Sequence, residues 1–310
     1  MRALVTGAAG FVGSHLVDAL VARGDTVVGV DCYTAYYDIE QKRANARATG
    51  LEIVEADLRT VPIEPLLDGV DVVFHQSGQP GVRLSWSTGF AEYVEQNVIV
   101  TQRLLDAVHT AGARRFVYAS SSSVYGPQRR YPTTEDDLPA PFSPYGVTKL
   151  AAEHLCGVFA ANWGLPTVSL RYFTVFGPRQ RPDMSIHRLC ESAVTGAAFP
   201  LFGDGAQIRE FTYVSDIVAG NLAAAEADVA PGTIVNLAGG AEITIADLIA
   251  MVGDVAGTPI AIDERPREPG DSLRNGGAID RAHELLGWEP RVALRDGIVA
   301  QLEWHRSRRD

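Results

Sequence analysis

A tyrosine and a lysine four residues apart form a pair that could carry out redox chemistry. Tyr145 and Lys149 stand in the segment SPYGVTK, which has the pattern of a helix start, so both side chains project from one helix face and can meet. A protonated lysine near a phenol favours the phenolate and lowers the phenol pKa from about 10 toward the working range. The phenolate can then remove a hydroxyl proton while a hydride leaves the same carbon. Alternatively, a YxxxK spacing marks only an amphipathic helix surface.

A run of serines precedes this pair by about one strand and helix. The segment YASSSSVYG contains Ser120, Ser121, Ser122 and Ser123, and its first residues end a predicted strand. Parallel sheets bind ligands at the carboxyl ends of their strands, where these hydroxyls can hold a reacting oxygen. The alternative is a polar loop that satisfies its own backbone.

A glycine-rich turn follows the first predicted strand and opens a helix. Its spacing, GxxGxxG, allows a tight turn and a close approach of backbone N–H groups to a diphosphate, although the glycines could serve only the turn. The residues that we expect to line this cofactor site are Gly7, Gly10, Phe11, Val12 and Gly13.

An aspartate ends the second predicted strand. Asp31 stands at roughly the offset of ~20 residues where a carboxylate accepts hydrogen bonds from the adenosine ribose and repels a 2′-phosphate. Cys32 and Tyr33 follow it in place of an arginine, so NAD is favoured over NADP. Asp57 and Leu58 follow the third strand, where a side chain could bind the adenine amine. A plain turn or cap is the alternative for Asp57.

The elements that must position these residues alternate between short apolar runs and helical patterns. Such alternation predicts βαβ units and a doubly wound parallel sheet of the Rossmann type. The predicted strands lie at 2–7, 26–31, 51–57, 70–76, 115–121 and 167–173, and helices are expected at 11–24, within 91–112 and after residue 143. We expect an NAD-binding domain over residues 1–172. Residues 173–310, with helices near 185–196, 215–228, 244–256 and 281–287, should form a smaller substrate-binding α/β domain whose segments interleave with the first.

The composition limits the possible partners. The 310 residues carry a net charge of −11, which disfavours nucleic acid as a partner, and 46% of them are hydrophobic, enough for a sizeable core. Three scattered cysteines suit a cytoplasmic protein without disulfides, and the seven histidines lack metal-ligand spacing, so no metal is expected. The opening MRALVTGAAG lacks the pattern of a secretion signal, and no segment approaches ~18 apolar residues, so we expect no membrane partner.

Taken together, the motifs resemble those of the extended short-chain dehydrogenase/reductases, and among them the NAD-dependent nucleotide-sugar epimerases and dehydratases. The resemblance runs from TGAAGFVGSHL through Asp31, the serine run and YxxxK to RYFTVFGP, REFTYVSDIV and Gly270-Asp271. It implies that Ser121, Tyr145 and Lys149 are catalytic and that Lys149 also holds the nicotinamide ribose.

The same resemblance assigns the remaining expected site residues. It implies that Gln76, Ser77, Gly78, Asn97, Ser120 and Tyr172 line the cofactor site, although HQSGQPGVR departs from the family's usual HLAAQAGVR. It also implies a substrate site near the sugar or diphosphate, formed by Val82, Arg83, Ser121, Ser122, Ser123, Tyr145, Thr174, Arg181, Arg209 and Asp271.

The residues beside the catalytic serine distinguish between reactions within the family. Its 4,6-dehydratases carry Asp-Glu where this chain has Ser122 and Ser123, and its glucuronate decarboxylases carry Glu at the place of Ser123. The chain therefore lacks the acidic and basic side chains that the family uses for elimination of water and for decarboxylation. Epimerisation at C4 through a 4-keto sugar remains, with NAD regenerated in each cycle.

The segment TVFGPRQRPDM resembles a signature of UDP-glucuronate 4-epimerases. An arginine fork such as Arg181 suits a sugar carboxylate, and we expect it to act with Thr174. The alternative is that Arg181 pairs with a nearby carboxylate such as Asp183. We therefore expect conversion of UDP-glucuronate to UDP-galacturonate by a homodimer, with a UDP-glucose/UDP-galactose 4-epimerase as the main rival. Decarboxylase, dehydratase and non-catalytic NAD-binding module are weaker alternatives.

Overall fold

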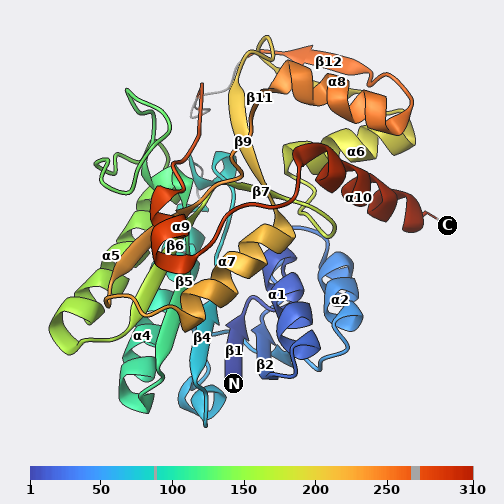
Figure 1. Ribbon diagram of the computed structural model, residues 1–310. Helices are drawn as coiled ribbons and strands as arrows, with labels where there is room; N and C mark the ends of the chain where they lie inside the picture. The colour runs from blue at the N-terminus through green and yellow to red at the C-terminus, as the bar shows by residue number, and fades with distance from the viewer. Residues whose placement is uncertain (87–88, 267–272, 310) are drawn as a thin grey trace.

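A seven-stranded parallel sheet forms the centre of the computed structural model, which describes residues 1–86, 89–266 and 273–309 (Figure 1). Near-continuous runs of Val, Leu and Ile build its strands because both faces of the sheet are buried. The strand order β10-β6-β5-β4-β1-β2-β3 and the parallel pairing confirm the predicted Rossmann-type fold. The strands are β1 (Arg2–Thr6), β2 (Thr26–Asp31), β3 (Val54–Glu55), β4 (Val72–His75), β5 (Arg115–Ser121), β6 (Thr167–Tyr172) and β10 (Thr233–Leu237).

Helices cover both faces of this sheet (Figure 1). One apolar core lies between the sheet and α1 (Phe11–Ala22) and α7 (Val214–Glu226), with α2 (Ile39–Ala48) packed against α1. A second core lies on the other face, under α4 (Val100–Ala111) and α5 (Pro144–Trp163). The two layers leave the carboxyl ends of the strands open for ligands.

The long helix expected within residues 91–112 is present but is not uniform. It consists of α3 (Phe90–Tyr93), a π-helical segment over Val94–Ile99 and α4. A π-helical turn displaces the side chains that follow it from α-helical spacing and is frequent at functional sites. Asn97, an expected cofactor residue, lies in this turn.

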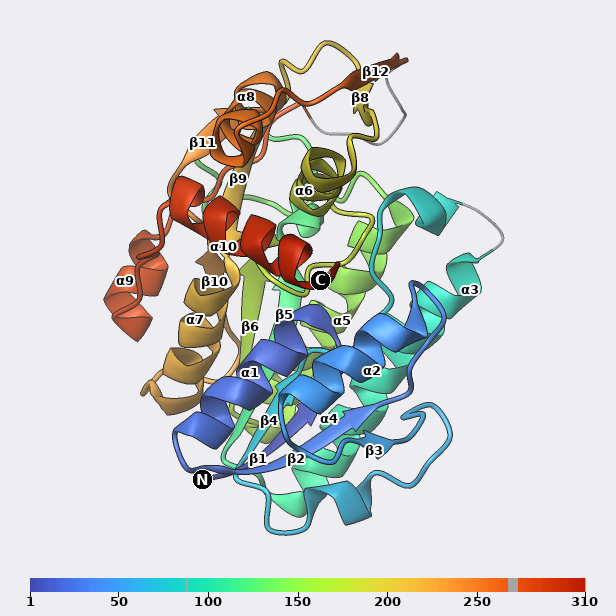
Figure 2. The same cartoon turned by 90° about the vertical axis from the view of Figure 1, so that its right-hand side faces the viewer.

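A smaller unit lies over the carboxyl ends of the central strands (Figure 2). Its own core lies between a three-stranded sheet and three helices. The three-stranded sheet contains β7 (Thr174–Phe176), β9 (Ile208–Tyr213) and β11 (Glu242–Thr244), and β8 (Phe199–Phe202) pairs with β12 (Ile262–Arg265). The helices of this core are α6 (Ser185–Thr195), α8 (Ile245–Ala256) and α10 (Leu294–Ser307), and α9 (Asp280–Leu286) packs beside β10.

Three features differ from the sequence expectation. The regular series does not close at residue 173, because β10 adds an edge strand beside β6. Helix α2 was not expected, since its segment IEQKRANARA is largely polar and buries Gln41, Lys42 and Asn45. Strand β3 has two residues instead of the predicted seven.

The division into domains at residue 173 stays a prediction, while α7 and β10, from the second segment, pack in the layers of the first. None of the helices in the described ranges is both long and apolar enough to cross a lipid bilayer.

Candidate active site

A cavity of about 500 Å³ lies where the strands of the central sheet end. Its volume is in the range of small-molecule sites. Most of the site residues expected from the sequence line it: Gly7, Gly10, Phe11, Val12, Gly13, Asp31, Leu58, Gln76, Ser77, Gly78, Val82, Asn97, Ser120, Ser121, Ser122, Ser123, Tyr145, Lys149, Tyr172, Thr174, Arg181 and Arg209. Asp57 and Arg83 are outside the lining. Asp271 lies outside the residues that the structure describes.

The glycine-rich turn is packed so closely that side chains would not fit. A Cβ atom on Gly13 would lie 2.0 Å from the carbonyl oxygen of Gly7, and one on Gly7 would lie 2.9 Å from the backbone of Ser77. Gly10 caps α1 without a side-chain hydrogen bond, so backbone N–H groups of the first helical turn remain for a ligand. These features fit a diphosphate group at the helix N-terminus.

Asp31 lies beside this turn with its carboxylate held by backbone groups. Its Oδ2 accepts a hydrogen bond from the N–H of Ala9 (3.1 Å), and its Oδ1 accepts one from the N–H of Tyr33 (2.8 Å). Burial raises the pKa of Asp31, and the two N–H groups and the charge of Lys42 only partly oppose this shift. The position suits a carboxylate that receives ribose hydroxyl groups.

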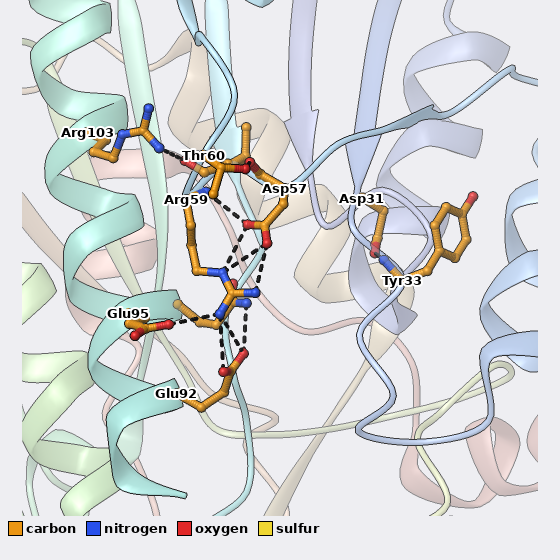
Figure 3. A network of polar contacts seen from close by, with 10 residues as sticks. Asp31, Tyr33, Asp57, Arg59, Thr60, Glu92, Glu95 and Arg103 are labelled. Carbon is orange, nitrogen blue, oxygen red and sulfur yellow. Dashed lines mark hydrogen bonds and ion pairs between the residues drawn. The ribbon is translucent and has the colours of Figure 1, made fainter.

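Asp57 is not among the residues that line the cavity, and its carboxylate lies against a neighbouring arginine (Figure 3). Arg59 binds both of its carboxylate oxygens, with Nη2 2.8 Å from Oδ2 and Nε 3.1 Å from Oδ1, and lowers the Asp57 pKa. The same guanidinium contacts Glu92 and Glu95, so it links this loop to the helix that carries Asn97. Leu58, not Asp57, lines the cavity here. The structure thus shows a local ion pair for Asp57, and its contact with adenine stays a prediction.

Asn97 holds the loop after β4 through both atoms of its amide. Its Oδ1 accepts from the N–H of Gln79 (2.7 Å), and its Nδ2 donates to the carbonyl of Gln79 (3.1 Å) and to Thr148 Oγ1 (2.9 Å) on α5. A Cβ atom on Gly78 would lie 2.7 Å from Asn97 Oδ1. A glycine at position 78 is therefore required for this close approach. Asn97 joins the cofactor loop to the helix that bears Tyr145.

A second buried amide, Asn221, contacts two residues that line the cavity and was not predicted from the sequence. Asn221 on α7 accepts hydrogen bonds at Oδ1 from Gln76 Nε2 and Tyr172 OH, both at 2.9 Å. The Tyr172 hydroxyl also lies 3.1 Å from Gln76 Oε1. No local motif marks Asn221, because only the fold brings α7 into contact with Gln76 and Tyr172.

The expected catalytic residues converge at the ends of β5 and α5. Ser121, Tyr145 and Lys149 all line the cavity, and Lys149 is buried one turn further along α5 than Tyr145. A Cβ atom on Gly146 would lie 2.5 Å from the carbonyl oxygen of Ser123, so only glycine lets α5 begin this close to the serine run. Ser143 caps the helix by accepting from the N–H of Gly146 (3.1 Å). These local features bring together residues from two elements.

The pKa values of the tyrosine and the lysine shift in opposite directions. Burial raises the pKa of Tyr145, and the Ser121 side chain and the charge of Arg181 oppose the shift only in part. Burial lowers the pKa of Lys149 to about 8, against smaller opposing effects of Cys156 and Glu153. The expectation that Lys149 lowers the phenol pKa is not met, because desolvation of the phenol dominates. A lysine with a pKa near neutrality can nevertheless exchange protons at physiological pH.

A buried ion pair lies next to this centre and contacts the serine run. Arg171 on β6 binds Glu153 on α5 through two contacts, Nη2 to Oε1 (2.6 Å) and Nε to Oε2 (3.0 Å). Ser120 donates a further hydrogen bond to Glu153 (2.6 Å). Both charged side chains are about 2% exposed, so they must satisfy each other. The pair was not recognised in the sequence, where its members lie 18 residues apart.

The cavity is also lined by Arg181, whose guanidinium binds Asp183. Nε lies 3.0 Å from Asp183 Oδ1 and Nη2 lies 3.1 Å from Oδ2. The pairing that the sequence left open as an alternative is therefore present. Because Asp183 engages Nε and Nη2, the Nη1 edge of the guanidinium is not part of this contact. Thr174 lines the same cavity, and its Oγ1 lies 3.4 Å from Asn275 Nδ2.

Of the two remaining arginines that we expected at the site, only one lines the cavity. Arg209, on β9, lines the cavity, and its Nη1 donates to the carbonyl of Ile208 (2.9 Å). Arg83 instead stacks on the ring of Phe202, with Cζ 4.1 Å from the ring centroid. We therefore find no support in the geometry for direct contact of Arg83 with a ligand in this cavity.

Several lining residues were missed because they come from the unexpected α2 and from the loop before it. Tyr36, Tyr37 and Lys42 line the cavity, and Tyr36 OH reaches Asp183 Oδ2 at 3.3 Å. The aromatic pair in AYYD was the available signal, but nothing in the sequence placed it opposite Asp183. Among the described residues, no group of three or more His, Cys, Asp or Glu side chains could hold a metal ion.

The fold and the cavity together define an α/β protein that binds a dinucleotide and carries a Ser-Tyr-Lys centre. Residues 3–238 match the family model described as the NAD dependent epimerase/dehydratase family, and the chain belongs to this family.

Solved structures with similar folds bind sugar nucleotides. The UDP-glucuronic acid 4-epimerase of Bacillus cereus, in complex with UDP-glucuronic acid and NAD, is 40% identical with a TM-score of 0.95 over 99% of both chains. MoeE5 in complex with UDP-glucose and NAD is 39% identical with a TM-score of 0.91 over 100% of both chains. A protein of Bacillus subtilis (strain 168) named "Uncharacterized UDP-glucose epimerase YtcB" is 37% identical over 309 residues, 98% of each chain.

Proposed function

We propose that this protein is an NAD-dependent epimerase that interconverts UDP-glucuronate and UDP-galacturonate through a 4-keto intermediate. The observation that carries the proposal is that one cavity is lined both by Ser121, Tyr145 and Lys149 and by Arg181. The similarity to a UDP-glucuronic acid 4-epimerase at a TM-score of 0.95 supports it.

The residues at the cofactor end of the cavity fit NAD. The glycine turn and the N-terminus of α1 would hold the diphosphate, the Asp31 carboxylate would accept the adenosine ribose hydroxyls, and Lys149 would hold the nicotinamide ribose. When bound, NAD supplies a reversible hydride acceptor for C4 of the sugar. Asp31 lies where a 2′-phosphate would meet a like charge, which favours NAD over NADP.

The chain supplies the proton chemistry of the reaction. We assign Tyr145 as the group that takes the proton of the C4 hydroxyl and later returns it. Ser121, which lines the cavity together with Tyr145, would hold the same sugar oxygen. A positive charge on Lys149 would favour the phenolate that accepts this proton, against the burial that raises the pKa of Tyr145. The keto sugar must then present its opposite face before the hydride returns, which inverts C4.

Ser122 and Ser123 limit the reaction to epimerisation. Both line the cavity beside Ser121, and neither hydroxyl is acidic or basic enough to drive loss of water or of CO₂ at neutral pH. Oxidation of C4 in a glucuronate creates a β-keto acid. Such an acid loses CO₂ when the bond that joins its carboxylate to the ring is perpendicular to the plane of the ketone. We assign Arg181 with Thr174 to hold the carboxylate away from that alignment, through the guanidinium edge that Asp183 leaves available.

The test is incubation of the purified protein with UDP-glucuronate, followed by separation of products and mass measurement. We expect UDP-galacturonate of unchanged mass, negligible UDP-pentose, and NAD in the protein as purified. UDP-pentose as the main product would make it a decarboxylase, and absence of any turnover with bound NAD would favour a binding module. Neither result is compatible with the proposal.

The second candidate function is UDP-glucose/UDP-galactose 4-epimerisation. One observation favours it: Asp183 already occupies part of the Arg181 fork, which lowers the positive charge available to a substrate carboxylate. Complexes of MoeE5 with UDP-glucuronic acid and with UDP-glucose show that one similar protein accommodates both sugars. A side-by-side measurement of kcat/KM for UDP-glucose and UDP-glucuronate decides between the candidates.

We also propose a cytoplasmic homodimer. Ile99 at the end of the π-helical segment and Val147, Val158 and Trp163 on α5 are each between 46% and 54% exposed, and α4 and α5 lie side by side on the outer face of the sheet (Figure 1). Apolar side chains on two adjacent helices favour pairing with the same helices of a second copy. Sedimentation should give twice the monomer mass, and Val158→Glu should reduce it; a monomer at micromolar concentration would disprove this arrangement.

A further inference from the structure

Two glutamines far apart in sequence form a buried pair behind Arg181. Gln180 follows β7 and Gln301 lies on α10, and neither side chain is exposed to solvent. Gln301 Nε2 donates to Gln180 Oε1 at 2.7 Å. Neither residue lines the cavity, but Gln180 is the immediate neighbour of Arg181, which does.

The pair belongs to a hydrogen-bond chain with a fixed direction. The N–H of Gly177 donates to Gln301 Oε1 (2.8 Å), Gln301 donates to Gln180, and Gln180 Nε2 donates to the carbonyl of Val175 (2.7 Å). Each amide can satisfy its partners in only one orientation, because a flipped amide would oppose donor to donor or acceptor to acceptor. An unmatched group here would be buried without water, so the chain is strongly specified.

The chain holds a turn whose backbone is unusual. Gly177 has φ +141° and Arg179 has φ +64°. Residues other than glycine rarely adopt such positive φ values, so the conformation of Arg179 is unusual. The N–H of Gln180 closes the turn on the carbonyl of Gly177 (3.2 Å). Arg179 then points outward to Asp18 (2.7 Å), while Arg181 points into the cavity. The opposite directions of the two arginines depend on this turn.

Other elements fix the backbone of the same glutamine. The carbonyl of Gln180 accepts hydrogen bonds from Gln41 Nε2 on α2 (3.2 Å) and from His187 Nδ1 on α6 (2.8 Å). Gln180 is thus held at its side chain by α10 and at its carbonyl by α2 and α6. A change at Gln301 would remove only the first of these attachments, which makes it a selective probe.

We infer that Gln301 is a positioning residue that sets the preference for an acidic sugar by fixing the turn from which Arg181 reaches the substrate. The inference rests on the proposed function. It places a determinant of substrate choice on the C-terminal helix, outside the cavity. Loss of the Gln301 hydrogen bonds should loosen the contact with the sugar carboxylate and leave the nucleotide half of the substrate unaffected.

The experiment compares Gln301→Glu and Gln301→Met with the wild type, each as the NAD-loaded protein. In Gln301→Glu the acceptor for Gly177 is retained and the donor to Gln180 is lost, whereas Gln301→Met removes both at similar length. Calorimetric titration with UDP-glucuronate and with UDP separates the sugar from the nucleotide, and steady-state kinetics separate KM from kcat. Glu303→Gln, at an exposed position on the same helix, is the matched control.

We expect Kd and KM for UDP-glucuronate to rise about tenfold in both variants, with Kd for UDP changed less than about twofold and kcat less affected than KM. The control should match the wild type. Equal weakening of UDP and UDP-glucuronate, no change for either ligand, or loss of folding in both variants by thermal unfolding would overturn the inference, since the role would then be general or purely structural. Absence of UDP-glucuronate turnover in the wild type is a separate result and would reject the proposed function instead.

Discussion

Asp183 binds Arg181 along one edge of its guanidinium, with Nε and Nη2 at 3.0 and 3.1 Å from the two carboxylate oxygens. An arginine fork can bind carboxylates along two edges, so this pairing orients the group without using all of its donors. Asp183 raises the pKa of Arg181 against the effect of burial, so the guanidinium stays charged. Substrate choice should therefore depend on a planar fork, which a lysine cannot reproduce.

We predict that Arg181→Lys lowers kcat/KM for UDP-glucuronate by about 100-fold, since a bidentate contact becomes a point charge. The fraction of product that has lost CO₂ should increase, because the carboxylate is no longer held. Product separation with mass measurement gives both quantities.

The matched control for this variant is Arg179→Lys, in the same turn. Arg179 pairs with Asp18 outside the cavity, so its replacement should leave the product distribution unchanged. Unchanged UDP-glucuronate binding and unchanged CO₂ release in Arg181→Lys would reject the assigned role of Arg181.

Tyr145→Phe should lower kcat by about 10³-fold or more, because the variant removes the proposed proton acceptor. The ring should keep its edge contact with Tyr93, whose centroid lies 6.2 Å away, so binding of UDP-glucuronate should change less than about threefold. Single-turnover absorbance of reduced NAD and calorimetric titration measure the two effects. Ser121→Ala is the companion variant, with an expected loss of about 10²-fold. Turnover at the wild-type rate in Tyr145→Phe would show that another group moves the proton.

Asp31→Asn should weaken NAD binding by about tenfold, since its amide cannot accept from Ala9, Tyr33 and a ribose hydroxyl at once. Affinity for NADP should remain poor, because no arginine replaces the lost charge. Titration of cofactor-stripped protein with both dinucleotides measures the change. Asp68→Asn, at an exposed position, serves as the control. An unaltered affinity for NAD would show that Asp31 only supports the turn.

His75 should make stability depend on pH in the acid range. It is fully buried, with Nδ1 2.8 Å from Thr6 Oγ1 and Nε2 2.9 Å from Thr101 Oγ1, and burial lowers its pKa from 6.5 to about 3. The unfolded chain therefore binds more protons between these values, and the free energy of unfolding falls as pH drops from about 6.5 toward 3. Between pH 7 and pH 5 the loss from this residue should be about 2 kcal/mol.

Denaturant unfolding of His75→Gln at pH 7, 6 and 5 isolates this effect. The pKa of His305 is also lowered, to about 4, so some acid sensitivity should remain in the variant. The difference between wild type and variant should shrink as the pH falls. A constant difference over this range would show that His75 does not titrate on unfolding.

The local parts of the site could be predicted from the sequence by itself. Glycines at 7, 10 and 13, the Asp31 carboxylate after a strand, and the YxxxK spacing each encode a short-range requirement: a tight turn, a strand end, or one helix face. The alternation of apolar runs and helical patterns likewise predicted the parallel sheet, because hydrophobic periodicity reports which faces are buried. These features need no knowledge of what the rest of the chain contacts.

Only the tertiary structure decided which distant groups meet. It added β10 to the sheet, and it brought Asn221 on α7 into contact with Gln76 and Gln301 on α10 into contact with Gln180. Buried polar partners of this kind leave no periodic pattern in the sequence, because each contact depends on the geometry of the folded protein. Gln180 and Gln301, for example, are more than a hundred residues apart in the chain. The sequence by itself was enough to predict the fold and the residues of the proposed catalytic centre, whereas contacts of α10, α2 and α6 with Gln180 hold the turn from which Arg181 reaches the cavity.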